Sequence, residues 1–321
     1  MKAFAQAVVV TSVMGLAAGA AQAIDIVPTF VDGAGQTWDA TKRAVINQAI
    51  ADWDARILNN QTIPVTFDFT NAGTGGYLGL WEGNYSEFAG TNIYPWTSGV
   101  DHVVHFNADL MDTSQPNYLL FTLGSVPFAN WDALSITRHE LGHMLGFTDQ
   151  FYVNDFANAG QTDKWSSHIV GTVFDSGGLN VQMAAPDNLS HTLDSGSTAN
   201  DLMNPALLNG QRRTIGALDQ AMLEEAYQYQ MAPDPNADGV VNFTDLLLLA
   251  QHYGLTNANF TEGDFNGDGA VGFSDLLMLA QNYGQTLAAA PVLAGIASIP
   301  EPATSGVLAL ACAAVTCRRR R

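Results

Sequence analysis

The most informative segment of this sequence is Asp132-Ala-Leu-Ser-Ile-Thr-Arg-His-Glu-Leu-Gly-His-Met-Leu-Gly-Phe147. Its apolar residues recur at helical spacing, which predicts an amphipathic helix. Asp132, or Asn130 just before it, can cap the helix N-terminus, and Gly146 stands near the expected end. We therefore expect one helix over this stretch.

Two histidines on this helix are spaced for metal binding. Residues four apart lie one turn apart on the same helix face, so His139 and His143 can each present an imidazole nitrogen to one Zn²⁺. Glu140 lies about 100° round the helix, within reach of a zinc-bound water. The pattern predicts a zinc site in which Glu140 is the catalytic general base.

The residues that follow extend the pattern. Gly146, three residues after the second histidine, lets the chain leave the helix sharply, and the sequence here resembles the metzincin metallopeptidases. Asp201-Leu-Met203-Asn-Pro205 resembles their Met-turn, in which a methionine lies beneath the zinc. The resemblance covers residues 24–231 and implies a twisted sheet over helices, with the substrate extended along an edge strand.

Two residues are candidates for the third zinc ligand. Asp149 occupies the position that the common metzincin pattern gives to this ligand. His191 lies twelve residues before Met203, an arrangement similar to the leishmanolysin-type metzincins. We favour His191, because a neutral imidazole is the commoner zinc ligand, and keep Asp149 as the alternative. His168 is a weaker candidate.

The remaining histidines have structural interpretations. His102 and His105 are three apart on an expected strand, so they should point to opposite faces and not share a metal. His252 lies in a repeat whose second copy has Asn282 at that place, so no chemistry is expected of it.

Other periodic segments predict the rest of the first domain. Helical spacing or strand alternation predicts helices over residues 38–58 and 217–230, and strands over 63–69, 100–106 and 118–123, with a glycine-rich loop at 73–79. Helix, strands and then the histidine helix predict an α/β or α+β order, and we favour α+β, the metzincin-like class. The expected C-terminal helical subdomain follows from the metzincin resemblance.

A second, smaller module begins after residue 232. It contains two copies of an oxygen-rich loop, thirty residues apart, each followed by one helix. The ligands expected at Ca²⁺-loop spacing are Asp234, Asn236, Asp238, the Val240 carbonyl, Asn242 and Asp245, then Asp264, Asn266, Asp268, the Ala270 carbonyl and Asp275. Gly272 leaves the ninth position of the second loop to a water. Oxygen ligands alone favour calcium over a transition metal.

The repeat pair resembles a type I dockerin. The twelfth position is aspartate in both loops, no helix precedes the first loop, and both loops lead into Asp-Leu-Leu-x-Leu-Ala-Gln-x-Tyr-Gly. The resemblance implies two bound Ca²⁺ ions and docking to a cohesin-like protein. A calcium-stiffened spacer is the alternative role.

Both ends of the sequence resemble targeting segments. Residues 1–23 predict a signal peptide, with one lysine, an apolar stretch and a small-x-small cleavage site. Residues 300–321 combine Pro-Glu-Pro, an apolar run and four arginines, and resemble a PEP-CTERM sorting signal. That resemblance implies processing by an exosortase-type enzyme and display on the surface or matrix of a Gram-negative bacterium. Membrane contact is expected only through this segment before processing.

Composition excludes some function classes. The formal net charge is −19, and five of the twelve basic residues, Lys2 and the four C-terminal arginines, lie in the expected targeting segments, so nucleic acid is excluded as a partner. Both cysteines, Cys312 and Cys317, lie in the C-terminal segment, so we expect bound metals rather than disulfides to stabilise the mature chain.

Together these patterns predict five segments: a signal peptide (1–23), a zinc metallopeptidase domain (24–232), a dockerin-like module (233–285), a linker (286–299) and a sorting segment (300–321). The expected activity is zinc-dependent endopeptidase cleavage of protein or peptide substrates. The alternative is a catalytically inert surface or matrix protein that uses its calcium module for docking or adhesion.

Overall fold

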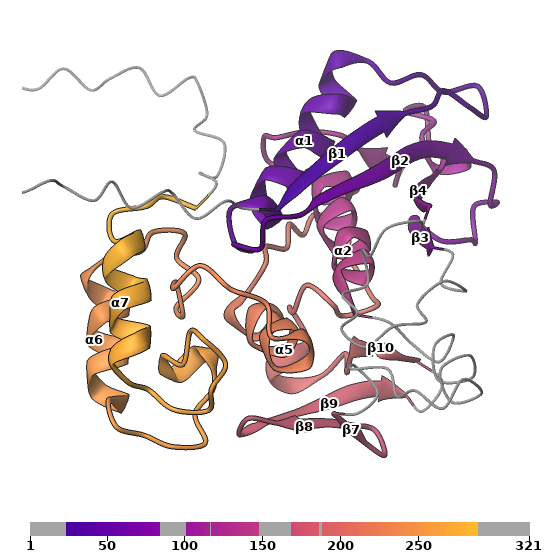
Figure 1. Ribbon diagram of the computed structural model, residues 1–321. Coiled ribbons are helices and arrows are strands. Elements are labelled where there is room, and N and C mark those ends of the chain that lie inside the picture. The colour runs from indigo at the N-terminus through magenta and orange to yellow at the C-terminus, as the bar shows by residue number, and fades with distance from the viewer. Residues whose placement is uncertain (1–23, 84–100, 116, 148–167, 186–187, 288–321) are drawn as a thin grey trace, which may run out of the picture. The chain divides into compact units, whose positions relative to one another are not determined.

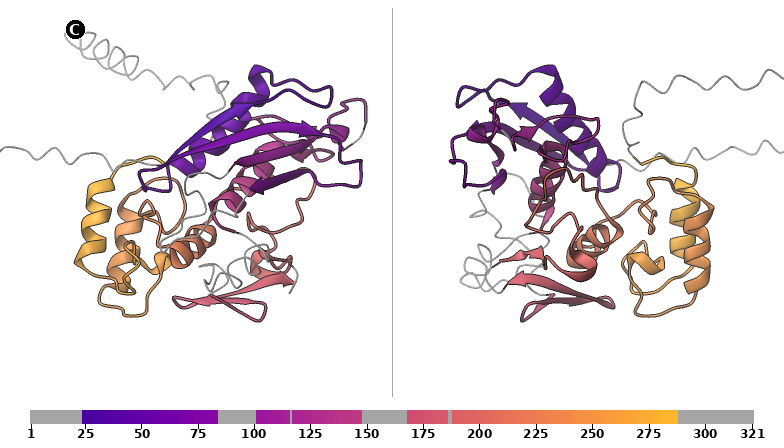
Figure 2. Two further views of the ribbon diagram at one scale, coloured as in Figure 1. Left: turned by 45° about the vertical axis from the view of Figure 1, so that its right-hand side comes forward. Right: turned by 180° about the vertical axis from the view of Figure 1, so that it is seen from behind.

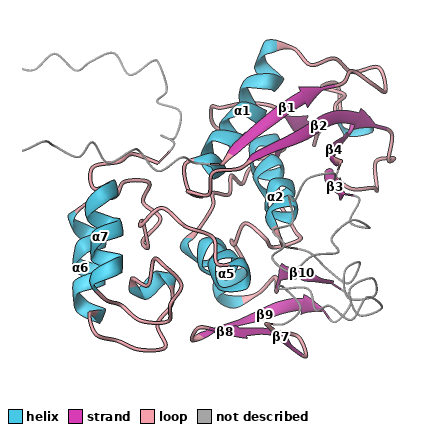
Figure 3. Ribbon diagram, in the orientation of Figure 1, coloured by secondary structure: helices cyan, strands magenta, loops and turns pink. Residues whose placement is uncertain are grey.

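The computed structural model describes residues 24–83, 101–115, 117–147, 168–185 and 188–287. By their contacts, the described residues belong to one compact unit. The described residues contain five α-helices, shown in Figures 1 and 3: α1 (Ala40–Asp54), α2 (Ala133–Leu145), α5 (Ala217–Tyr227), α6 (Phe243–His252) and α7 (Phe273–Asn282). The N-terminal region is mixed α+β, as predicted, and the C-terminal region is helical.

The principal sheet has the strand order β1-β2-β4-β3. Its strands are β1 (Asp25–Phe30), β2 (Thr62–Thr70), β4 (His102–Asn107) and β3 (Gly79–Gly83). The first three are parallel, and β3 runs antiparallel to β4 at the edge of the sheet. One free edge of this sheet is therefore formed by β3.

One face of this sheet carries the main core. The buried residues of β2 alternate along the strand at Ile63, Val65, Phe67 and Phe69, as a strand with one covered face requires. Helices α1 and α2 cover the sheet on one side (Figure 2). Trp53 of α1 is fully buried, and its indole N–H donates to the Arg138 carbonyl of α2 at 2.9 Å.

A second sheet was not predicted from the sequence. It is antiparallel, in the order β10-β9-β8-β7, with β7 (Ile169–Val170), β8 (Val173–Ser176), β9 (Leu179–Ala185) and β10 (Asn188–Thr192). Two further strands, β5 (Leu119–Leu120) and β6 (Trp131–Asp132), pair in parallel. The expected strand 118–123 is thus reduced to two residues.

Helix α2 has the predicted limits at both ends. Asp132 is its N-cap and accepts a hydrogen bond from the Ser135 amide at 3.1 Å. At the other end Gly146 has φ +134°, a conformation that side chains rarely adopt. A Cβ atom there would also lie 2.2 Å from the Tyr227 ring of α5, so glycine is required both to end the helix and to admit α5.

The two repeat helices confirm the internal symmetry of the sequence. Each starts directly after an oxygen-rich loop, and Asp245 and Asp275 occupy equivalent places in the first turns of α6 and α7. Each of these carboxylates accepts a hydrogen bond from the amide at its helix N-cap, Asn242 or Gly272, at 2.7 Å. The aspartate at the twelfth position therefore also begins the helix.

A buried ion pair joins α1 to α2. The Arg138 guanidinium contacts Asp52 Oδ2 through Nε at 2.6 Å and through Nη2 at 2.5 Å, and both side chains are almost fully buried. Arg138 Nη1 also donates to the Arg213 carbonyl at 2.6 Å. Removing one partner of such a pair leaves an uncompensated buried charge.

We predict that Asp52→Asn lowers the free energy of unfolding by about 3–5 kcal/mol, because Arg138 loses its counter-charge in a dry environment. Urea denaturation of the purified chain measures the loss. Asp39→Asn is the matched control: it breaks the exposed pair with Lys42 but keeps a good N-cap, and should cost below about 1 kcal/mol. Equal losses in the two variants would contradict the role given to the buried pair.

Candidate metal centres

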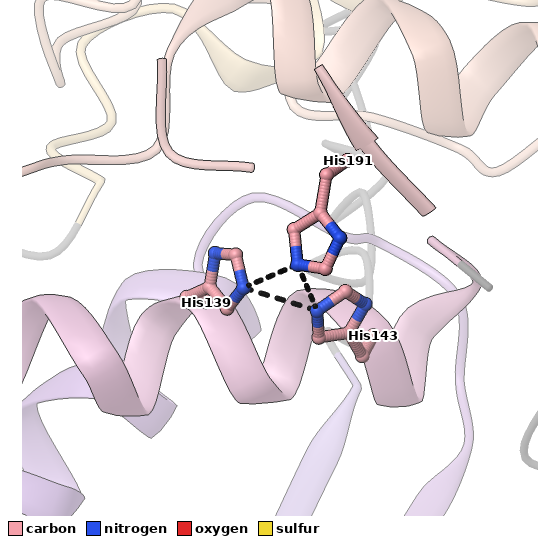
Figure 4. Close-up of side chains that lie close together, drawn as sticks. All are labelled: His139, His143 and His191. Atoms are coloured by element: carbon pink, nitrogen blue, oxygen red, sulfur yellow. Dashed lines mark hydrogen bonds between the residues drawn. The ribbon is translucent and has the colours of Figure 1, made fainter. Parts of the chain in front are cut away.

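Three histidines from two elements converge in this compact unit. The Nε2 atoms of His139 and His143, on α2, are 3.0 Å apart, and the Nε2 atom of His191, on β10, lies 3.1 Å and 3.2 Å from them. Figure 4 shows the three rings pointing toward one another, with dashed lines joining these atoms. Among the described residues this is the one group of three or more His, Cys, Asp or Glu side chains spaced to hold a metal ion.

The backbone fixes which nitrogen of each helical histidine faces the centre. Nδ1 of His139 donates to the Leu202 carbonyl at 2.8 Å, and Nδ1 of His143 donates to the Phe147 carbonyl. A neutral imidazole with its proton on Nδ1 presents a lone pair on Nε2. Nδ1 of His191 lies 3.0 Å from Ser190 Oγ, which can accept a hydrogen bond from it in the same way. Such partners orient the imidazole ligands of metal sites.

The surroundings keep these rings neutral. Burial, followed by the neighbouring charge of His143, lowers the pKa of His139 to about 3, and burial lowers the pKa of His143 to about 4. The pKa of His191 is lowered further, by burial and then by His143 and His139. Metal ligation requires unprotonated imidazole, so these directions favour metal binding at neutral pH.

The donor set fits a zinc ion. Nitrogen ligands about 2.0–2.1 Å from a tetrahedral metal are about 3.3 Å from each other. The observed separations of 3.0–3.2 Å require only a slight opening of the cluster. Three lone pairs held this close repel one another unless a cation lies between them. A site with three protein ligands also leaves the fourth position of a tetrahedral ion open.

Glu140 lies between this centre and the edge strand β3. It is buried, and its Oε2 accepts the Trp81 amide of β3 at 2.8 Å. Burial raises the pKa of Glu140 to about 8, against the opposing effect of the Trp81 hydrogen bond. A Cβ on Gly79 would lie 2.4 Å from Ile136 and 3.2 Å from Glu140, so only glycine lets β3 pass this close to α2.

The segment 201–204 contacts both elements that carry the three histidines. Met203 is fully buried, and its sulfur would lie 2.6 Å from a Cβ placed on Gly142 of α2. Its carbonyl accepts the Thr192 amide at 3.0 Å, and Asp201 accepts both the Thr192 hydroxyl and the Met203 amide. The segment therefore holds β10, which carries His191, against α2.

A cavity of about 370 Å³ opens beside the three histidines. Its wall combines main chain and side chains of β3 with the residues around segment 201–204, including Leu80, Trp81, Asn204, Pro205, Leu207 and Arg213. A concave and mostly apolar space next to a few convergent polar groups is the usual form of a binding site.

The other predicted ligands lie elsewhere. Asp149 falls outside the described residues. His102 is buried beside Trp81, while His105 is on the opposite face with Nδ1 2.5 Å from Asp68, so these two do not share a metal, as expected. His168 stacks near Phe174 and does not join the cluster. His252 bonds the Leu248 carbonyl within its own helix.

Several supporting residues were missed by the sequence analysis. Ser190 contacts the His191 ring, and the Trp81 amide contacts Glu140. The Arg213 guanidinium donates to the Asn204 carbonyl at 3.0 Å, and the Arg213 backbone amide donates to the Ser135 hydroxyl oxygen at 2.7 Å. Nothing in local spacing indicates these partners. The glycines at 79 and 142 could have indicated that other elements approach closely here, since each permits such an approach.

The calcium-type loops collect buried carboxylates. Asp234, Asp245, Asp264 and Asp275 are all at most 1% exposed. Burial raises the pKa of Asp245 to about 6 and that of Asp264 to about 6. Residues 233–284 contain no lysine or arginine to balance these groups. Asp245 Oδ1 is buried without a hydrogen-bond partner, which fits a site that a cation completes.

Comparison with protein families identifies the second module. Residues 232–283 match the dockerin type I domain. A dockerin module implies calcium binding and docking to a cohesin-containing protein, and dockerin proteins are extracellular or displayed at the cell surface. The match does not include the histidine helix, and no curated protein matches the chain. No helix within the described residues is long and apolar enough to cross a membrane.

We predict that Ser190→Ala weakens zinc binding at the histidine cluster by about tenfold or more, because the His191 ring loses the partner of its Nδ1. Competition with a chromophoric zinc chelator measures the affinity. Ser176→Ala, which removes a β8 hydroxyl bonded to Glu225, is the control and should leave the affinity unchanged. Equal affinities in all three proteins would show that Ser190 does not orient a ligand.

Proposed function

We propose that this protein is an exported zinc-dependent endopeptidase that carries a calcium-binding dockerin module. The observation that carries the proposal is the convergence of three imidazole Nε2 atoms within 3.2 Å beside the buried carboxylate of Glu140, in a cavity bordered by an edge strand. His139, His143 and His191 are the proposed ligands. His191 is preferred to Asp149 because its ring already faces the other two.

In the proposed peptide hydrolysis, the zinc ion and Glu140 have separate roles. Zinc, when bound, acidifies a coordinated water and polarises the scissile carbonyl. Glu140 would be ionised when the charge of the bound ion offsets the burial that raises its pKa. It then takes the proton from the attacking water and delivers it to the leaving amine. The Trp81 hydrogen bond holds one oxygen of Glu140 in place, and the Leu202 carbonyl keeps the His139 ring aligned. The segment 201–204 is thus proposed to act as a Met-turn.

The edge strand supports a peptide substrate. Among the strands that the structure describes, β3 pairs with β4 alone, and it lines the cavity with Gly79, Leu80 and Trp81. An extended peptide can add to such an edge through main-chain hydrogen bonds, which tolerate many side chains. This arrangement agrees with the metzincin resemblance, in which substrates lie along an edge strand, and favours proteins or peptides over small esters.

Replacing Glu140 by Gln should reduce casein hydrolysis by at least about 10²-fold, because the amide cannot accept the proton of the attacking water. Zinc content, measured by atomic absorption on the same sample, should stay at one ion per chain. Glu225→Gln is the control, a carboxylate of α5 that bonds Ser176 and contacts no histidine. Undiminished cleavage by the Glu140 variant would refute the mechanism.

Metal removal tests the same proposal independently. A zinc chelator should abolish cleavage and added zinc should restore it, with calcium present throughout to keep the second module folded. If the chain binds calcium but neither binds zinc nor cleaves protein, the alternative of an inert surface or matrix protein is the better interpretation. His191→Ala and Asp149→Ala, assayed for zinc content, identify the third ligand.

Docking is a second proposed function, favoured by a repeated surface. Large apolar side chains at equivalent positions of the two repeats are exposed, in the pairs Phe243 and Phe273, Leu247 and Leu277, and Tyr253 and Tyr283. Exposed apolar patches of this kind mark interaction sites. With calcium at Asp234–Asp245 and Asp264–Asp275, the module would dock the peptidase to a cohesin-containing protein outside the cell.

Calcium removal should destabilise the dockerin module, because its buried aspartates then lack a counter-ion. We expect excess EGTA to lower its unfolding temperature, and calcium at about 100 times its dissociation constant to contribute about 2.7 kcal/mol. Circular dichroism melting of the full chain measures this, with magnesium at the same concentration as the control. An unfolding temperature that is insensitive to EGTA would contradict calcium binding.

A further inference from the structure

Glu224 is a buried carboxylate that neither module's motif explains. It lies on α5, the last helix before the calcium repeats, and is 1% exposed. Its Oε2 atom is buried without a hydrogen-bond partner. An isolated carboxylate in such a place is unfavourable unless a cation or a proton compensates it.

The carboxylate of Glu224 lies at the second calcium-type loop. A Cβ atom on Gly267, the fourth residue of that loop, would lie 2.1 Å from Glu224 Oε1. The charged groups that act on Glu224 are Glu225 and two expected calcium ligands, Asp264 and Asp275, and all three are acidic. Glu224 thus approaches the loop at Gly267, and the charges that act on it there come from acidic side chains.

The two calcium-type loops differ in the number of ligands that they supply. In the first loop the ninth position holds Asn242, whereas in the second it holds Gly272, which offers no side-chain ligand. Both residues have the same extended backbone, with φ −146° and −137°. The first loop also has a basic neighbour, since the Arg56 charge acts on Asp234. The loop that lacks a ligand is the one approached by an additional carboxylate.

We propose that Glu224 completes the second calcium site from outside the repeat, so that the bound ion ties α5 to the dockerin module. The second loop then has six protein ligands, as the first has, and Glu224 adds one carboxylate to its three aspartates. Calcium would thereby hold the histidine-bearing region and the docking module in one arrangement, and loss of calcium would release them. The inference depends on calcium binding by the repeats and not on the proposed peptidase activity.

Calcium titration of the full chain by calorimetry tests the proposal. The wild-type chain should bind two ions. Glu224→Gln, which keeps the shape but removes the charge, should weaken one of the two sites by about tenfold or more. Glu225→Gln, its neighbour on α5, should leave both sites unchanged. Combining Glu224→Gln with Gly272→Asn should recover affinity, because Asn242 shows that this backbone accepts an asparagine ligand.

Hydrogen exchange tests whether bound calcium links α5 to the dockerin module. Calcium should slow amide exchange in α5 of the wild-type chain and of Glu225→Gln, and should do so much less in Glu224→Gln. Unchanged calcium affinity in Glu224→Gln would overturn the inference, and so would a loss that Gly272→Asn does not recover. A wild-type chain that binds no calcium at the second loop would overturn both the inference and the calcium assignment.

Discussion

The arrangement of the histidine centre depends on one short turn, residues 201–204. Its Leu202 carbonyl accepts a hydrogen bond from Nδ1 of His139, and its Met203 carbonyl accepts one from the backbone amide of Thr192, next to His191. The turn thus touches both elements that supply imidazoles. Arg213 holds its far end through the Asn204 carbonyl and is itself bonded to Arg138 of α2. The imidazoles of helix α2 and of strand β10, which belongs to the antiparallel sheet, are thereby held within the few ångströms that a shared ion requires.

Both candidate centres concentrate unfavourable electrostatics that a cation would relieve. Three imidazole lone pairs face one another at the first centre, and buried aspartates gather at the second without lysine or arginine. Folding tolerates such groups only if something compensates them. From a residue count alone, the acidity of the chain would be explained by the solubility of its surface. Part of that acidity belongs instead to these buried sites.

Local patterns predicted the elements well where the signal lies within a dozen residues. The helix over Ala133–Leu145 with its Asp132 cap, the strand Thr62–Thr70 and both repeat helices follow from periodicity and capping, which act between near neighbours. The sheet β7–β10 was missed, because its short strands alternate weakly and gain stability from each other rather than from propensity. The expected helix 217–230 ends at Tyr227, where Gln228 adopts a left-handed conformation.

The chemistry of each motif can be read from local sequence: two histidines and a glutamate on one helix, and two oxygen-rich loops in register. These are set by helical pitch and loop geometry, which need no distant partner. The sequence offered His191 beside Asp149 as a third ligand, but which side chains from other elements meet each motif depends on the folded chain. His191 reaches the centre from 48 residues beyond His143, and Glu224 reaches a loop of another module. Such meetings depend on how sheets and helices pack, and packing is a property of the whole chain rather than of any segment.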